Sequence, residues 1–203
     1  MGGQASNGHT AGDGAGGEAR SALIEAAIGT NQAYYLAHWR RMDETGKSYD
    51  WNWAACILNV FWFAFRKMWA PAVLLAIVWA VSGVLMADPS NKTLFRAGAL
   101  VLILPSFVTG GFGNLWYRRR IERLVAGTAG MDRDAALARL RARGGVSALG
   151  LILSILVVLV LSIAPAVPAI LEKARQQQRE QQQLPAGQRA SVESAAANPP
   201  GAN

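Results

Sequence analysis

The chain has 203 residues, a formal net charge of +7 and a single cysteine, Cys56. One cysteine excludes an intramolecular disulfide and supports neither a zinc site nor a redox pair. The basic residues gather at the ends of apolar stretches, which favours contact with membrane lipids, through anionic headgroups, over binding of nucleic acid.

The two ends of the chain differ in composition from its middle. Residues 1–20 and 172–203 consist mainly of Gly, Ala, Ser, Gln and Pro with scattered charges. Such segments bury too little apolar surface to offset the entropy lost on ordering the chain. We therefore expect a disordered N-terminal tail at 1–20 and a disordered Gln-rich tail at 172–203.

Residues 21–67 form a region that we predict to be helical and to lie in the cytoplasm or at a membrane surface. Within it, residues 31–42 have the pattern of an amphipathic helix, with Tyr34, Tyr35 and Trp39 on one side. Aromatic side chains next to arginines are typical of helices that lie between lipid and water.

A short aromatic-rich stretch, WNWAACILNVFWFAF, occupies residues 51–65. Its apolar part, from Trp53 on, would extend only about 20 Å as a helix, which is too short to cross a membrane. It is followed by Arg66 and Lys67, which would be costly at the centre of a bilayer, whereas Pro71 suits the first turn of a new helix. We expect a separate amphipathic or re-entrant helix here; the alternative is a short helix packed inside the bundle.

Three long runs without charged residues follow, at 68–87, 97–117 and 146–171. About 20 apolar residues in a helix cross the hydrocarbon core of a bilayer. The sequence therefore predicts an all-α integral membrane protein with three transmembrane helices, which form a bundle over 68–171. Small residues recur along one face of each run, so the helices can pack closely within one bundle or against a second copy.

Positive charge indicates the orientation of the bundle. The connection 118–145 contains eight arginines, whereas the connection 88–96 contains only Lys92 and Arg96. Because short loops rich in Lys and Arg stay in the cytoplasm, we predict a multi-pass protein of the bacterial inner (cytoplasmic) membrane with a cytoplasmic N-terminus and its C-terminal tail outside. Candidate contacts for anionic lipid headgroups are Arg118, Arg119, Arg120 and Arg123; the alternative is a solvated face.

The predicted spans contain no Asp, Glu, His, Lys or Arg. Ionisable groups mark proton relays and ion sites inside membranes, so neither is expected here. The chain also has no phosphate-binding glycine loop and no nucleophile motif, and we predict no enzymatic activity, no catalytic residue, no cofactor and no metal site. The glycine cluster TGGFGN at 109–114 is better explained by close packing or a hinge than by ligand binding.

Three stretches resemble the signature blocks of a bacterial family of small membrane proteins known as domain of unknown function 2628. They are IGTNQAYYLAHW (28–39), WNWAACILNVFWFAFRKMW (51–69) and GGFGNLWYRRRIERL (110–124), and the resemblance covers about residues 25–150. It implies an integral membrane protein with a soluble N-terminal flank and no established activity. The chain has Trp69 where the family pattern usually has Tyr after Arg-Lys-Met.

Aromatic and polar residues concentrate at one predicted membrane boundary, which favours a non-enzymatic membrane interaction or scaffold protein that binds either a copy of itself or another membrane protein. The predicted interaction surface consists of Tyr34, Tyr35, Trp39, Asn52, Asn59, Trp62, Arg66 and Lys67. The alternative is a component of a transporter or channel for a small solute, because uncharged spans do not exclude passive permeation.

Overall fold

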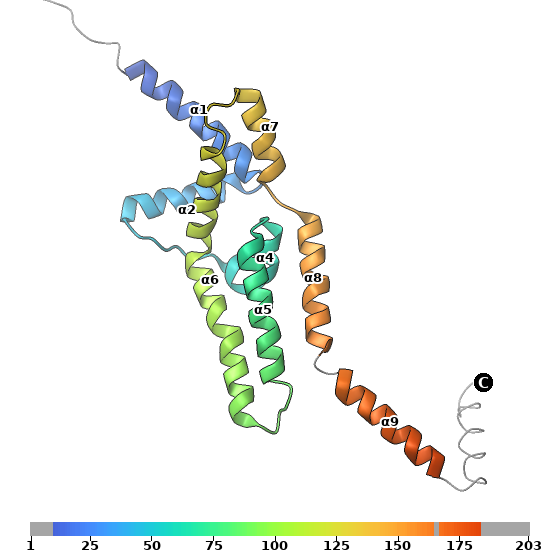
Figure 1. The fold of residues 1–203 in the computed structure, drawn as a ribbon. Coiled ribbons are helices and arrows are strands. Elements are labelled where there is room, and N and C mark those ends of the chain that lie inside the picture. The colour runs from blue at the N-terminus through green and yellow to red at the C-terminus, as the bar shows by residue number, and fades with distance from the viewer. Residues whose placement is uncertain (1–9, 165–166, 184–203) are drawn as a thin grey trace, which may run out of the picture. The chain divides into compact units, whose positions relative to one another are not determined.

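The computed structural model describes residues 10–164 and 167–183, and every regular element in these two ranges is a helix (Figure 1). The all-α prediction is therefore confirmed for this part of the chain. The chain divides into two units, residues 1–161 and 162–203. The first unit holds the functional candidates.

Two helices lead into the first unit. Helix α1 (Thr10–Ile28) begins inside the stretch that we expected to be disordered, so the prediction for 10–20 was wrong, while 1–9 lie outside the described residues. Gly29 adopts a φ of +70°, which ends α1 and lets α2 (Gln32–Thr45) leave in a new direction. The amphipathic helix predicted at 31–42 is thus present as α2.

The short apolar stretch forms two helices where we expected one. Helix α3 (Trp53–Leu58) and helix α4 (Val60–Phe65) are separated by Asn59, whose φ of +42° breaks the helical path. The side chain of Asn52 caps α3 by accepting a hydrogen bond from the N–H of Ala55 at 2.9 Å. Most of α4 is buried, which corresponds to the alternative of a short helix inside the bundle, whereas Trp53 on α3 remains exposed.

Helices α5 (Trp69–Leu85) and α6 (Lys92–Ala126) run in opposite directions as a hairpin (Figure 1). Gly98 allows them to approach, since a Cβ atom there would lie 2.6 Å from Cγ of Met86. The Ser82 hydroxyl also donates a hydrogen bond to the carbonyl of Gly98 at 2.7 Å. Helix α6 continues past the predicted span boundary at Tyr117, because the charged residues that follow also favour a helix.

Helices α7 (Arg133–Arg143) and α8 (Ala148–Ile163) complete the first unit apart from the last two residues of α8. The N–H of Gly145 donates to the carbonyl of Ala27 at 2.8 Å, and the N–H of Ser147 donates to the carbonyl of Phe65 at 2.8 Å. These bonds attach the segment between α7 and α8 to the ends of α1 and α4.

The second unit contains helix α9 (Val167–Gln183). The third predicted span, 146–171, is therefore divided between α8 and α9. The prediction of disorder was wrong for 172–183, which are helical, and it lies outside the described residues for 184–203.

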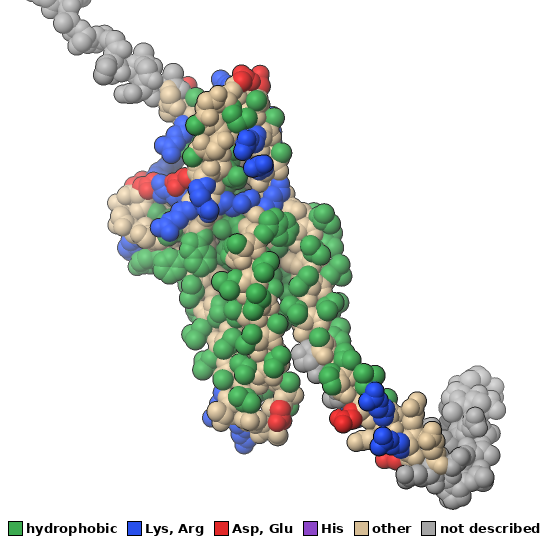
Figure 2. Space-filling model, in the orientation of Figure 1, with side chains coloured by type: hydrophobic (Ala, Val, Ile, Leu, Met, Phe, Trp, Pro, Cys, Tyr) green, Lys and Arg blue, Asp and Glu red, His purple; other side chains and the backbone are tan. Residues whose placement is uncertain are grey.

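Within the described ranges, two helical stretches are long and apolar enough to cross a membrane: Lys92–Ala126, which is α6, and Arg133–Ile163, which includes α7, the bend at 144–147 and α8. Helix α5 is apolar but has only 17 residues, so two such stretches replace the three that we predicted. Only 17% of the most apolar window of each stretch is buried. Figure 2 shows hydrophobic side chains over α5, α6 and α8, and Lys and Arg side chains gathered where these helices meet α1, α2 and α7.

Candidate functional site

The buried core lies where α2, α3 and α4 meet the middle of α6. We call the cluster of aromatic and polar side chains at this point the junction. It consists of Tyr35, Trp39, Asn52, Trp62, Arg66, Asn114 and Tyr117, each no more than 6% exposed.

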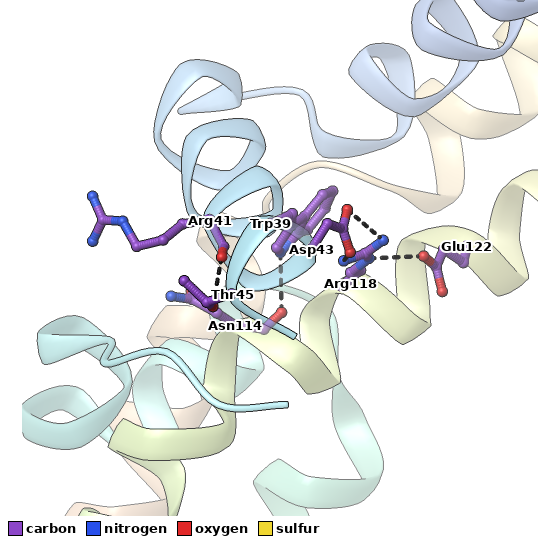
Figure 3. Close-up of polar contacts among 7 residues, drawn as sticks. All are labelled: Trp39, Arg41, Asp43, Thr45, Asn114, Arg118 and Glu122. Atoms are coloured by element: carbon purple, nitrogen blue, oxygen red, sulfur yellow. Dashed lines mark hydrogen bonds and ion pairs between the residues drawn. The ribbon is translucent and has the colours of Figure 1, made fainter. Parts of the chain in front are cut away.

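Asn114 of α6 connects two parts of the junction. Its backbone carbonyl accepts a hydrogen bond from Nε1 of Trp39 at 3.1 Å, which attaches α2 to α6 (Figure 3). Its side-chain Oδ1 accepts a hydrogen bond from Nδ2 of Asn52 at 2.8 Å. Because buried amides are costly when they are left unpaired, these bonds fix the position of α3 along α6.

Two glycines of α6 make this close approach possible. A Cβ atom on Gly113 would lie 2.7 Å from Cβ of Ala55, and one on Gly110 would lie 2.9 Å from Cβ of Cys56. The backbone N–H of Asn52 donates to the carbonyl of Gly110 at 2.7 Å. The glycine cluster at 109–114 therefore serves close packing, as its sequence indicated.

Arg66 is a buried cation, with only 3% of the residue exposed. Its Nη1 donates to the carbonyl of Thr30 at 3.3 Å and to the hydroxyl of Tyr117 at 3.4 Å. Its guanidinium carbon lies 4.7 Å from the ring centroid of Tyr35 and 5.1 Å from that of Tyr117. Contacts of this kind with desolvated aromatic rings stabilise a cation by about 2 kcal/mol or more.

The aromatic rings around Arg66 stay neutral at physiological pH. Burial raises the pKa of the Tyr35 hydroxyl above its usual value of 10.0, and the Arg66 charge only partly opposes this effect. Among the described residues no carboxylate forms an ion pair with Arg66. The positive charge is therefore held by ring faces, a hydroxyl and a backbone carbonyl, and Arg66 joins the end of α1 to α2, α4 and α6.

The structure brings the predicted interaction residues together but does not present them as a surface. Five of the eight are buried, so the prediction of an exposed surface was wrong for Tyr35, Trp39, Asn52, Trp62 and Arg66. Their neighbours on α6 cover them, and those neighbours follow about 50 to 80 residues later in the chain.

The other three predicted interaction residues lie at the edge of the junction. Tyr34 is 37% exposed, and its ring contacts that of His38 in a tilted arrangement, with centroids 4.1 Å apart. The Asn59 side chain donates to the hydroxyl of Ser106 at 3.0 Å, and Nζ of Lys67 donates to the carbonyl of Ala142 at 3.0 Å. These two bonds also connect helices within the first unit.

The structure separates the four arginines predicted to contact lipid headgroups into two pairs. Arg118 binds both carboxylate oxygens of Asp43, at 2.7 and 3.1 Å, and its Nε donates to Glu122 at 2.9 Å (Figure 3). Arg120 is partly buried and donates to the carbonyl of Arg143 at 3.2 Å. Arg119 and Arg123 are exposed.

Sequence reasoning missed some participants in the site. Tyr117 and Thr30 complete the surroundings of Arg66, and His38 bonds to the carboxylate of Asp50 beside α2. Asn114 was missed as well, and the three-residue spacing that places Asn114 and Tyr117 on one face of α6 was the available signal. Over the described ranges, no group of three or more His, Cys, Asp or Glu is placed to hold a metal ion.

These features define an all-helical protein in which a buried junction connects basic and polar helices to long apolar ones. The family model described as Protein of unknown function (DUF2628) matches residues 22–123, which include the end of α1, the whole of α2 to α5, most of α6 and the whole junction. The chain belongs to this family, as the resemblance of its three sequence blocks indicated. Comparison with curated proteins and with solved structures finds no match.

Proposed function

We propose that this chain is an integral protein of the bacterial inner membrane that acts as a non-enzymatic interaction or scaffold protein. One observation carries the membrane part of the proposal: large apolar side chains are exposed on the apolar helices while polar ones are buried in the junction. Val84 is 67% exposed, Leu104 59% and Leu149 75%. Water-soluble monomers rarely expose continuous apolar patches larger than a few hundred Å².

The charge distribution supports an orientation for the protein. Basic groups from three elements gather at one end of the apolar helices, where Lys67 bonds to α7 and Arg120 bonds to the carbonyl of Arg143. By the positive-inside rule, this end faces the cytoplasm. Residues 86–91, at the opposite end of the α5–α6 hairpin, then lie toward the outer surface of the membrane.

The arrangement of the junction supports a scaffold rather than a catalyst. Its polar side chains bond to one another and to backbone groups of α6 and of the end of α1, so these bonds connect helices. They attach a group of helices, which we call the head and which consists of α1, α2, α7 and residues 118–126 of α6. A scaffold needs such a rigid attachment to present a partner-binding surface at a fixed height above the membrane.

The head also offers a groove of a suitable kind for a partner protein. It lies between α1, α2 and α6, has a volume of about 550 Å³ and is lined by charges of both signs, among them Arg20, Glu25, Arg40 and Glu122. Mixed charges give specificity for a polar segment of complementary pattern.

Membrane integration is tested by fractionating cells that express the full chain. We expect it in the membrane pellet after an alkaline carbonate wash and in solution only with detergent. A reporter inserted between residues 124 and 130 is expected to be accessible only from the cytoplasm. A chain that remains dispersed in detergent-free buffer, or a reporter accessible from outside, would contradict the proposal.

The scaffold role is tested by a photo-reactive amino acid at Arg40, in the groove of the head, with Val84 on α5 as the control position. We expect one defined protein adduct from position 40 in native membranes, and none of the same mass from position 84. Reversing a groove charge with Arg20→Glu should reduce that adduct several-fold. The same adducts from both positions, or no effect of the charge reversal, would argue against a partner in the groove.

A further inference from the structure

A second groove lies between α5 and α6, away from the junction. Its volume is about 800 Å³, and its walls are almost wholly apolar, with Leu74, Leu75 and Val78 on one side and Leu104, Pro105 and Val108 on the other. Sites that bury small molecules have volumes of roughly 300 to 1,000 Å³ and similar apolar walls. The groove therefore has the size and lining of a site for a small apolar group.

Positive charge lies beside one end of this groove. Pro105, Val108, Trp116, Arg119 and Arg123 all line it, and their spacing places them along one face of α6. Arg119 is 14 residues beyond Pro105, which corresponds to about 21 Å along the helix axis. The groove thus combines a long apolar channel with two arginines at the end where it reaches the head.

Of the four arginines between 118 and 123, these two are exposed and bind no carboxylate, although Nε of Arg123 donates to the carbonyl of Arg119 at 3.1 Å. Arg118 is occupied by Asp43 and Glu122, and Arg120 by the carbonyl of Arg143. In the described part of the chain, neither Arg119 nor Arg123 forms an ion pair with a carboxylate. Two exposed guanidiniums one helical turn apart provide several donors for the oxygens of a single phosphate group.

We propose that this groove is a binding site for an anionic glycerophospholipid, with one acyl chain between α5 and α6 and the phosphate at Arg119 and Arg123. The site rests on the proposed function, because lipid reaches this groove only when α5 and α6 lie in a bilayer. A lipid is the occupant that matches both halves of the groove: the apolar walls accept a hydrocarbon chain, and the arginines select a negatively charged headgroup. Bulk lipid of either charge would fill the apolar part alone.

The test uses the full chain in mixed bilayers of phosphatidylglycerol and phosphatidylethanolamine, extracted in mild detergent and analysed by native mass spectrometry. We expect the wild-type protein to retain phosphatidylglycerol in preference to phosphatidylethanolamine. The double variant Arg119→Ala, Arg123→Ala should lose about tenfold of this preference. The control variant Arg133→Ala, Arg141→Ala removes the same charge from exposed positions of α7 and should retain the wild-type preference.

A third variant examines the acyl-chain part of the site. Val108→Phe fills the groove without changing either arginine and should reduce the retained lipid several-fold, with the unfolding midpoint measured in parallel to establish that the variant folds. Equal retention of both lipids by the wild type, or equal loss in the double variant and its control, would overturn the inference. Displacement of the lipid by soluble glycerol phosphate would also overturn it, because it would show a site for free anions. If the variants instead lose the mass of a protein dimer and not the mass of a bound lipid, the groove holds a second copy of the chain.

The two proposals fail in different ways. If the chain does not fractionate with membranes, the proposed function fails. If the chain is integrated but the arginine variants retain lipid as the wild type does, only the inference about this groove fails.

Discussion

The junction and the apolar helices show opposite relations between chemistry and burial. In the junction, Arg66, Asn52 and Asn114 are at most 3% exposed. On the apolar helices, Val84 and Leu149 are 67% and 75% exposed. In the junction, hydrogen bonds and ring contacts hold buried polar groups, whereas the apolar helices leave most of their apolar side chains exposed.

This contrast explains why burial alone does not distinguish core from surface in a protein whose apolar helices are surrounded by lipid. In water, exposed apolar area is unfavourable by about 25 cal/mol per Å², so the sides of α5, α6 and α8 would destabilise a soluble fold. In lipid the same area is neutral, and stability depends on packing and on satisfied polar groups.

Arg66→Ala should give the largest loss of stability. It removes a cation from the faces of Tyr35 and Tyr117, which we estimate at about 2 kcal/mol. The cavity left by the buried side chain adds about 2 kcal/mol, for a total of about 4 kcal/mol. The measurement is equilibrium unfolding in mixed detergent micelles with increasing SDS.

The matched control is Arg41→Ala, since Arg41 is exposed on α2. We expect a change within about 0.5 kcal/mol. Equal midpoints for the two variants would mean that the buried guanidinium does not stabilise the junction.

Ile77→Lys tests the solvent around α5. Ile77 is 55% exposed in the middle of that helix, so a lysine there would have little effect on a protein surrounded by water. At the centre of a bilayer, the same change costs about 3 kcal/mol. We expect a smaller fraction of the chain to resist carbonate extraction.

Tyr49→Lys provides the comparison, because Tyr49 is also 55% exposed but lies in the loop before α3. It should leave the carbonate-resistant fraction unchanged. A soluble protein would respond to neither substitution.

Gly113→Ala and Gly111→Ala form a pair within one turn of α6. A methyl group at 113 would meet Ala55 at 2.7 Å, whereas nothing lies within 4 Å of a Cβ at 111. We expect a loss of about 1 to 3 kcal/mol for Gly113→Ala, because it overpacks the contact with α3. Gly111→Ala should instead raise stability by up to about 1 kcal/mol, because alanine favours the helix.

Both variants are measured by the same SDS unfolding. If they shift the midpoint in the same direction, helix propensity rather than the α3–α6 contact determines stability at this point.

The Asn52–Asn114 hydrogen bond should give the smallest effect. In a double-mutant cycle of Asn52→Ala and Asn114→Ala, we expect a coupling free energy of about 1 kcal/mol, which is typical of a buried neutral hydrogen bond. Additive losses in the cycle would show that the two amides act independently.

Much of the local structure could be predicted from the sequence. The break at Arg66 and Lys67 was predicted, and the structure places it between the end of α4 at Phe65 and the start of α5 at Trp69. Charges next to apolar residues give a strong local signal, because nearby residues determine both the free-energy cost of placing a charge in a membrane and the position of the helix boundary. The end of α6 was missed for a related reason: apolarity stops near Tyr117, but hydrogen bonding continues to Ala126.

The site was harder to predict, because its contacts join distant parts of the chain. The aromatic and polar residues of α2, α3 and α4 were identified, but their burial depends on Asn114 and Tyr117, which lie 75 and 51 residues beyond Trp39 and Arg66. A single sequence does not show which helix covers a given face. The same limitation concealed that Arg118 is paired while Arg119 is available.

Helix α6 carries the junction on one face, through Asn114 and Tyr117, and the proposed lipid-binding groove on another, through Val108 and Arg119. Because it is unbroken from Lys92 to Ala126, inserting one residue between Val108 and Asn114 would rotate everything beyond it by about 100°. The arginines would then point away from the groove, or Asn114 would lose its hydrogen bond with Asn52. The number of residues in this stretch is therefore constrained more tightly than their identities, and relatives with a working groove should differ here by substitution and never by insertion or deletion.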